Sequence, residues 1–443
     1  MYKVSLFNGT NEIVINEIGS KNGNRITGSI KKEINAIDSF QFEILPNNAG
    51  YEDIYNLTTL VKVYNTKLHR MEFEGRVLIA KPKMSDKGLF TKSVTCESDL
   101  GYLCDSSQRY GKHQNKTVRE YLELMIAEHN KNTTEDKHFI VGDVTVRDSN
   151  DSIYRFTDYK STWENIKEDL LDSLGGELRV RHENGVRFLD YLETIGEKKD
   201  TVIRLSRNMQ SIEEEKDPTS IITRLVPLGN KLRETDERLT IKSVNNGLDY
   251  IEDVEAAKTF GVIEKTMSWD DVTTAKILKT KGKDFLSENN RIKKKYSINV
   301  LDLSLIGLEA DSIGIFNTYR VVNPIMHIDE DLRVIGETIV IENPQTNTFT
   351  VGDKFEDIKT YQISLKKLSK NSLKANELSS KALNKVNNLQ DITYEMGVTM
   401  EESNKNSGDL VEIVSNLASI VEKNTKDLKE LSAKIDSISK GVK

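Results

Sequence analysis

Short runs that alternate hydrophobic and polar residues fill the first hundred residues of the chain. The clearest runs are NEIVINEI (residues 11–18), FQFEILP (40–46), TLVKVYN (59–65), EFEGRVLIA (72–80) and TKSVTCES (91–98). Alternation with a period of two predicts β-strands with one buried face, and Gly, Asn and Pro residues between the runs favour turns. We therefore predict a β-rich, barrel-like domain over residues 1–105.

The hydrophobic pattern changes to a helical period in the next hundred residues. Thr117 and Glu120 have capping-box spacing at the start of one predicted helix, and Ser161 and Glu164 have it at the start of a second. ELRVRHENGVRFLDYLE follows, two alternating runs joined by Asn-Gly, which predicts a β-hairpin. We predict an α+β domain over residues 106–205.

Strand-like runs resume after this domain. They include YSINVLDLSL (residues 296–305), TYRVVNP (318–324), LRVIGETIVIE (332–342) and NTFTVGD (347–353), and a predicted helix near residues 271–289 interrupts the region. We predict a second β-rich, barrel-like domain over residues 206–361. The predicted fold class is mostly β, with an α+β domain between two barrel-like domains.

Residues 362–443 follow a third pattern, with hydrophobic residues at alternating steps of four and three. This heptad repeat is typical of a left-handed coiled coil. The predicted core positions are Leu410, Val414, Leu417, Val421, Asn424, Leu428, Leu431, Ile435, Ile438 and Val442. The register extends back to Leu365 with no charged core position, although 23 of residues 365–442 are charged. A helix on the order of 115 Å long needs partner helices, so we predict a coiled-coil stalk.

Asn424 is the polar exception among these ten core positions. The segment VEKNTKD resembles the V-x-x-N-T-x-x pattern of trimeric coiled coils in bacterial adhesin stalks and phage fibres, with Val421, Asn424 and Thr425 at the fixed positions. The resemblance implies a parallel homotrimer whose three Asn424 side chains turn inward around chloride or another anion. Alternatively, Asn424 is a polar defect that fixes the alignment of the helices at a cost in stability.

The net charge, the cysteine content and the lack of long hydrophobic runs argue against several classes of protein. A net charge of -7 argues against a generally basic surface, so we expect no sequence-specific nucleic-acid partner. Cys96 and Cys104 are too few for a disulfide framework and predict free thiols in a reducing compartment. No hydrophobic run reaches the roughly 18 residues of a membrane span, and the first residues lack a signal-peptide pattern, so we expect synthesis in the cytoplasm.

Candidate catalytic residues do not combine into a recognisable set. The six His residues have no zinc-binding spacing. Cys96 or Cys104 with His113 is the nearest Cys–His pairing, but Cys96 lies in a predicted strand, which favours core packing. Asp329 and Asp331 would suit a paired-carboxylate site, although a turn between strands is the favoured explanation. We predict a protein that is not an enzyme and has no cofactor other than the anion at Asn424.

Several stretches, in this order, resemble a known family. They are EFEGRVLIAKPKMSDKGLFTKSVTCESDLGYLCDS, STWENIKEDLLDSLGGELRVRHENGVRFLDYL, ITRLVPLGN and YSINVLDLSLIGLEADSIGIFNTYRVVNP. They are similar to the N-terminal region of phage minor structural, or prophage endopeptidase tail, proteins, also called tail-associated lysins. The likeness to baseplate hubs implies two β-barrel domains per subunit and a trimer that forms a pseudo-sixfold ring capping the tail tube. Longer members carry a separate hydrolase downstream, where this chain has heptads without cysteine or histidine.

Pattern and resemblance together favour a structural function. The preferred hypothesis is a homotrimeric hub at the distal end of a phage or phage-like tail, made in the host bacterial cytoplasm and placed in the virion's tail tip or baseplate. The expected partners are the distal tail protein, other tail and baseplate proteins, the tape measure protein and a central fibre or tip protein. The alternative is a tail-associated peptidoglycan hydrolase, with its site in the α+β domain, that acts on the host cell wall.

Overall fold

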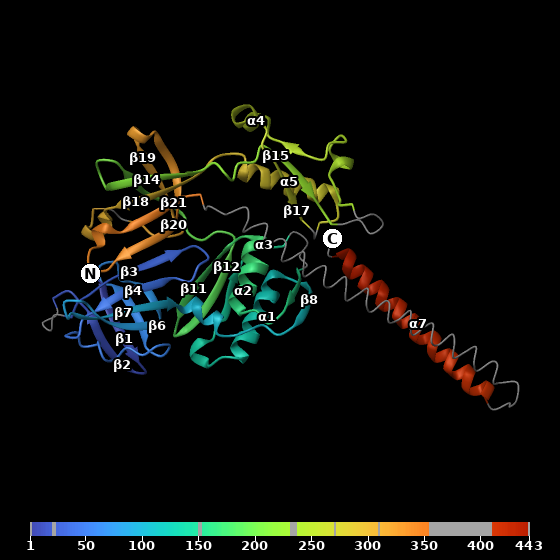
Figure 1. Cartoon of the computed structure of the whole chain (residues 1–443), viewed down its shortest axis with the longest axis horizontal. Helices are drawn as coiled ribbons and strands as arrows, with labels where there is room; N and C mark the ends of the chain where they lie inside the picture. The colour runs from blue at the N-terminus through green and yellow to red at the C-terminus, as the bar shows by residue number, and fades with distance from the viewer. Residues whose placement is uncertain are drawn as a thin grey trace. The chain divides into compact units, whose positions relative to one another are not determined.

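The computed structural model describes residues 2–19, 24–148, 153–230, 237–269, 272–308, 311–353 and 410–441 (Figure 1). The chain divides into two compact units. The first comprises Met1–Pro218 with Lys293–Phe355, and the second comprises Thr219–Ile292 with Glu356–Lys443. Strands provide most of the regular structure of the first unit, which confirms the mostly β prediction for the described residues.

A 13-stranded sheet forms the frame of the first unit. Its order is β14-β18-β21-β20-β3-β4-β7-β6-β5-β1-β2, and β19 joins β13 to β20. Alternate side chains form two hydrophobic cores, one around Phe40 and Phe42 and the other around Tyr296 and Phe349. The strands are β1 (Tyr2–Asn8), β2 (Asn11–Asn16), β3 (Ile26–Glu33), β4 (Ser39–Ile44), β5 (Leu60–Asn65), β6 (Arg70–Met84), β7 (Phe90–Ser98), β13 (Lys198–Arg204), β14 (Met209–Asp217), β18 (Lys293–Val300), β19 (Thr318–Asn323), β20 (Ile328–Val340) and β21 (Thr348–Gly352).

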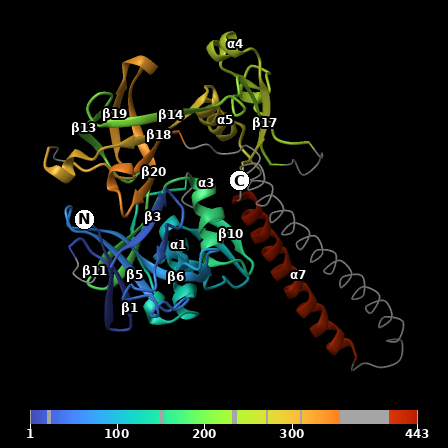
Figure 2. The ribbon, with the colours of Figure 1, turned by 60° about the vertical axis from the view of Figure 1, so that its left-hand side comes forward.

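The pairing of β20 with β3 joins the strands of the two predicted β-rich regions. The two strands are antiparallel, with Gly336 opposite Glu33 and Val340 opposite Ser29. Figure 2 shows β20 beside β3 from a second side. The predicted boundaries at residues 105 and 205 both fall within the first unit, and strands on either side of them share one sheet.

The middle of the first unit carries helices beside two small sheets. The capping boxes at Thr117 and Ser161 are both formed, as predicted. Asn184 and Gly185 have φ of 51° and 80°, which confirms the tight hairpin turn. The elements are η1 (Asp99–Cys104), β8 (Gly111–Lys116), α1 (Val118–Lys131), η2 (Glu135–Lys137), β9 (Ile140–Val144), β10 (Ile153–Thr157), α2 (Thr162–Ile166), the π turn Lys167–Leu171, α3 (Asp172–Leu174), β11 (Glu177–Glu183) and β12 (Val186–Leu192).

Residues 219–292 fold around a separate core that includes Leu225, Trp269 and Leu278. This segment lies between β14 and β18, which pair directly, so its two ends leave the sheet side by side at Asp217 and Lys293. The sequence predicted strands at the start of this segment and a helix near residues 271–289, but not a separate core. The elements are β15 (Arg224–Leu228), η4 (Lys242–Val244), β16 (Ile251–Glu252), α4 (Val254–Phe260), β17 (Glu264–Ser268) and α5 (Ala275–Asn289).

The last described element is the long helix α7 (Leu410–Gly441). It includes the strongest heptads of the predicted stalk, whereas the heptads from Leu365 to Ser407 lie outside the described residues. The remaining helices of the described residues are short: η5 (Leu303–Ile306), η6 (Pro324–Met326) and η7 (Pro344–Thr346). Among the described residues, no helix is both long and apolar enough to cross a bilayer.

Candidate functional site

The heptad face of α7 is the candidate assembly site. Leu417 and Leu428 are 46% and 39% exposed, Asn424 is exposed, and Val421 is half-buried. Thr425 Oγ1 donates a hydrogen bond to the Val421 carbonyl at 2.7 Å, so this hydroxyl is satisfied within the helix. An exposed apolar stripe with the period of a coiled coil is typical of a helix that buries this face against other helices.

For most of the other predicted core residues the structure describes the position on the helix but not the side chain. Leu410, Val414, Leu431, Ile435 and Ile438 lie on α7, but their side chains are outside the described set, and Val442 lies outside the described residues. Their roles in a trimer, and an anion at Asn424, therefore stay predictions.

The candidate cysteine chemistry has a structural explanation. Cys96 is fully buried in the core of the sheet, and burial raises the pKa of its thiol far above the ordinary value. His113 instead hydrogen-bonds Thr157 through Nε2 at 3.3 Å and packs edge-on against the Tyr121 ring. A thiol that resists deprotonation is a poor nucleophile, so Cys96 acts in packing.

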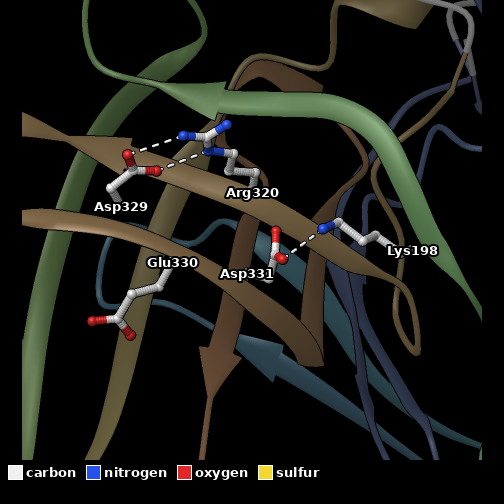
Figure 3. A pocket seen from close by; sticks show the side chains of 5 residues that line it. All are labelled: Lys198, Arg320, Asp329, Glu330 and Asp331. Atoms are coloured by element: carbon white, nitrogen blue, oxygen red, sulfur yellow. Dashed lines mark hydrogen bonds and ion pairs between the residues drawn. The ribbon is translucent and has the colours of Figure 1, made fainter.

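Asp329 and Asp331 lie within strand β20, so the favoured explanation of a turn is wrong (Figure 3). They are two residues apart and share a face of the strand, yet each binds its own cation. Asp329 accepts two hydrogen bonds from Arg320 at 2.8 and 3.0 Å, and Asp331 accepts one from Lys198 at 2.6 Å. The hydrogen bond from Arg320 lowers the pKa of the Asp329 carboxyl group. Asp329 is therefore ionised near neutral pH and cannot act as a proton donor there.

The part of the chain that the structure describes contains no group of three or more His, Cys, Asp and Glu residues arranged to hold a metal ion.

A buried charge cluster at the β3–β20 pairing was missed by sequence reasoning. Lys32 Nζ lies 3.0 Å from Glu72 Oε2 and 3.9 Å from Glu337 Oε2, and Arg70 Nε lies 2.7 Å from Glu72 Oε1. Burial opposes the charge on Lys32, but the carboxylates of Glu337 and Glu72 outweigh it and raise the lysine's pKa. The cluster therefore links β3, β6 and β20 at the point where the two β-rich regions join.

A second cluster ties the β11–β12 hairpin to η1. Asp99 Oδ2 accepts hydrogen bonds from His182 Nε2 at 2.6 Å and from Arg187 Nε at 2.7 Å. Arg187 also lies over the Tyr102 ring, 5.0 Å from its centroid. The only sequence signal was the alternation of charged and apolar residues along the hairpin, which does not identify a partner more than 80 residues away.

The His182–Asp99 pair predicts a pH dependence of stability. The hydrogen bond with Asp99 raises the pKa of His182 above its ordinary value of 6.5. The folded protein thus holds the His182 proton more tightly than the unfolded chain does. The pair therefore contributes its full stabilisation of the fold below pH 6.5, and this stabilisation is lost as the pH rises through the raised pKa of His182. Thermal melts of the protein and of His182→Gln should therefore differ most at pH 6 and converge toward pH 8.

Exposed His69, at a left-handed turn with φ of 51° that asparagine tolerates, provides the control. The same melts on His69→Asn measure the effect of removing an exposed histidine. A His182→Gln difference that does not depend on pH, or that matches the His69→Asn difference at every pH, would contradict the proposed role of the charged pair.

Comparison with known proteins supports the family resemblance. Residues 197–362 match the family described as prophage endopeptidase tail. No curated protein matches the chain.

Three solved structures have a similar fold at low sequence identity. The 43 kDa tail protein of prophage MuSo2 from Shewanella oneidensis shares 13% identity at a TM-score of 0.57, covering 80% of this chain and 98% of its own. The tail protein from Neisseria meningitidis MC58 shares 13% sequence identity at a TM-score of 0.54, and the match covers 80% of this chain and 97% of that protein. Prophage tail protein gp18 from Listeria monocytogenes EGD-e shares 14% sequence identity at a TM-score of 0.51, and the match covers 83% of this chain and 99% of that protein. The chain thus has the fold of phage tail proteins.

Proposed function

From the match of residues 197–362 to the prophage endopeptidase tail family, we propose that this protein is a structural hub at the distal end of a phage or phage-like tail. Three copies cap the tail tube, and the C-terminal stalk connects the hub to a tip or central fibre. The partners are the distal tail protein, other tail and baseplate proteins and the tape measure protein. The hub is made in the host bacterial cytoplasm and resides in the virion.

One observation carries this proposal, the exposed heptad stripe on α7 in a chain whose sheet has a tail-protein fold. A single α-helix with Leu417 and Leu428 in solvent leaves apolar surface that association would bury, at roughly 25 cal/mol per Å². Burial between three identical helices places the same residues at one axis, as closed cyclic symmetry requires.

The location and copy number can be tested on particles. Tails purified from a lysogen that encodes this chain should carry immunogold label at the distal end. Quantitative mass spectrometry should find about three copies per tail, as a trimer closed around the tube requires. Label along the tube, or a copy number like that of a tube subunit, would contradict the hub assignment.

Asn424 sets the number and register of the helices in this proposal, with an anion held at the axis. Asn424→Val should raise the melting temperature of the stalk, because a buried polar position specifies assembly at a cost in stability. The variant should also lose any stabilisation by chloride and form mixed assemblies. Melts followed by circular dichroism in chloride and in gluconate, with mass by light scattering, measure both effects.

Asn416→Val is the matched control, since Asn416 is exposed on α7 at a heptad position outside the seam. It should leave the assembly mass and the response to chloride unchanged. If both variants behave alike, Asn424 has no special place in the assembly.

The family description leaves peptidoglycan hydrolysis as the second candidate. The candidate catalytic residues are poorly suited to this reaction. Cys96 is buried, and Asp329 and Asp331 form ion pairs with Arg320 and Lys198. Zymography on purified cell wall should show no clearing at high protein. Clearing that survives Cys104→Ser and Asp331→Asn would direct the search to other residues of the chain.

A further inference from the structure

A cavity of about 350 Å³ opens in the first unit between the sheet and the β11–β12 hairpin. Its rim includes the exposed side chain of Met71, and its walls include buried Phe73 and Leu178. Its lining carries more carboxylates than basic groups: Glu33, Asp38, Glu72, Glu74 and Asp99 against Lys32, Arg179 and His182. The cavity therefore combines apolar walls with carboxylates, which is the surface that suits a positively charged group on an apolar chain.

Asp99 has an unused hydrogen-bond acceptor at this cavity. Its side chain is 3% exposed, and Oδ2 takes the hydrogen bonds from His182 and Arg187. Oδ1 is the one buried side-chain polar atom without a partner among the described residues. A buried carboxylate oxygen without a donor destabilises the folded state, so a donor that enters the cavity and reaches Oδ1 would gain from satisfying it.

Asp38 adds a second carboxylate, which has a hydrogen bond with the backbone of Glu33. No ion pair within 4 Å of Asp38 occurs among the described residues, and the Lys32 ammonium that attracts it is already hydrogen-bonded to Glu72. Burial raises the pKa of Asp38 to about 6, so this group ionises near neutral pH without a cation of its own. A positive charge in the cavity would favour the ionised form.

The cavity also suits an organic cation better than a metal ion. No three-ligand group of His, Cys, Asp and Glu occurs in the described ranges, this cavity included. Phe73 and Phe316 both line the cavity, and aromatic rings attract ammonium and guanidinium groups. A guanidinium has five N–H donors and is weakly hydrated, so it can meet separate carboxylates at a lower desolvation cost than a compact ion.

We propose that this cavity binds the guanidinium or ammonium end of an apolar chain, with Asp38 and Asp99 as the acceptors. Two sources share this chemistry, an arginine or lysine side chain of a neighbouring tail protein and a freely diffusing amine. The site does not depend on the trimeric hub, because all the residues that line it belong to one unit of one chain.

The full chain can be titrated with n-butylguanidinium and, as a neutral probe of similar size, butan-1-ol, by calorimetry. We expect saturable binding of one n-butylguanidinium per chain and none of butan-1-ol. Asp38→Asn should weaken this binding at least about tenfold, since it removes a charge-assisted hydrogen bond. Asp99→Asn is a second variant with the same expected direction.

Glu43→Gln is the control, since Glu43 is an exposed carboxylate outside the cavity that pairs with Lys83. It should bind the probe like the unmodified protein, and melting curves should show that Asp38→Asn remains folded. Equal binding of both probes, no saturable binding, or binding that Asp38→Asn leaves intact would overturn the proposal.

A blocked Ala–Arg–Ala tripeptide distinguishes the two sources. If the tripeptide binds as n-butylguanidinium does, the mouth admits a side chain that is attached to a backbone, which supports a neighbouring protein as the source. If only n-butylguanidinium binds, the site takes a diffusing cation. Both results support the cation site.

Discussion

Lys32→Met is expected to destabilise the folded protein by about 3–5 kcal/mol, which is the typical cost of removing one partner from a buried ion cluster. The side chains of Glu72 and Glu337 are only 2% and 3% exposed, and both lie within 4 Å of the Lys32 ammonium. Without Lys32, Arg70 is left to compensate Glu72, and Glu337 loses its ion pair. The midpoint of urea unfolding, followed by circular dichroism, measures the loss.

Two further variants separate this effect from a general loss of charge. Lys83→Met breaks an ion pair with Glu43 in which both side chains are about half exposed, so it should cost only about 0–1 kcal/mol. Lys32→Met combined with Glu337→Gln should recover part of the stability, because Arg70 still pairs with Glu72 and Glu337 no longer carries a charge. If Lys32→Met were as stable as Lys83→Met, the cluster would have no part in joining the two β-rich regions.

The double variant Leu417→Glu, Leu428→Glu is expected to abolish self-association of the chain. In a trimer it would place six carboxylates in the seam, and each would be desolvated beside two others of like charge. Sedimentation velocity at micromolar concentration should find a species with the mass of one chain. The sheet should remain folded, because the first unit has its own cores.

The control also introduces two glutamates, but on the opposite face of α7, and because one of them replaces a lysine it makes the net charge more negative than the seam variant does. Ser419 and Lys426 are exposed and lie outside the predicted seam. Ser419→Glu, Lys426→Glu should therefore leave the association state unchanged. Dissociation by both double variants would point to overall charge as the cause, and dissociation by neither would contradict the heptad register.

Local sequence patterns predicted the secondary-structure elements well, but they did not predict which distant strands pair. The capping box at Thr117 and the Asn184–Gly185 turn each depend on residues within a few positions, and both formed as predicted. The β3–β20 pairing depends on strands far apart in the chain, and neither strand's alternation identifies its partner. For the same reason the insertion at residues 219–292 was not recognised, since its strands resemble those on either side.

The sequence predicted the environment of some site residues correctly and of others incorrectly. Cys96 was correctly assigned to the core because a strand pattern surrounds it. Asp329 and Asp331 were assigned to a turn because acidic residues favour turns, but the backbone pairing of β20 with β19 places them in a strand. The cavity around Asp38 and Asp99 forms only when β6, β11 and η1 come together, so no short motif encodes it.

The native mass of the full chain in solution, by light scattering, tests the central claim most directly. The hub account predicts a mass of about three times 50.3 kDa at micromolar concentration, and a lower mass for a chain that ends at Tyr361. A full chain that remains at 50.3 kDa would contradict the trimer.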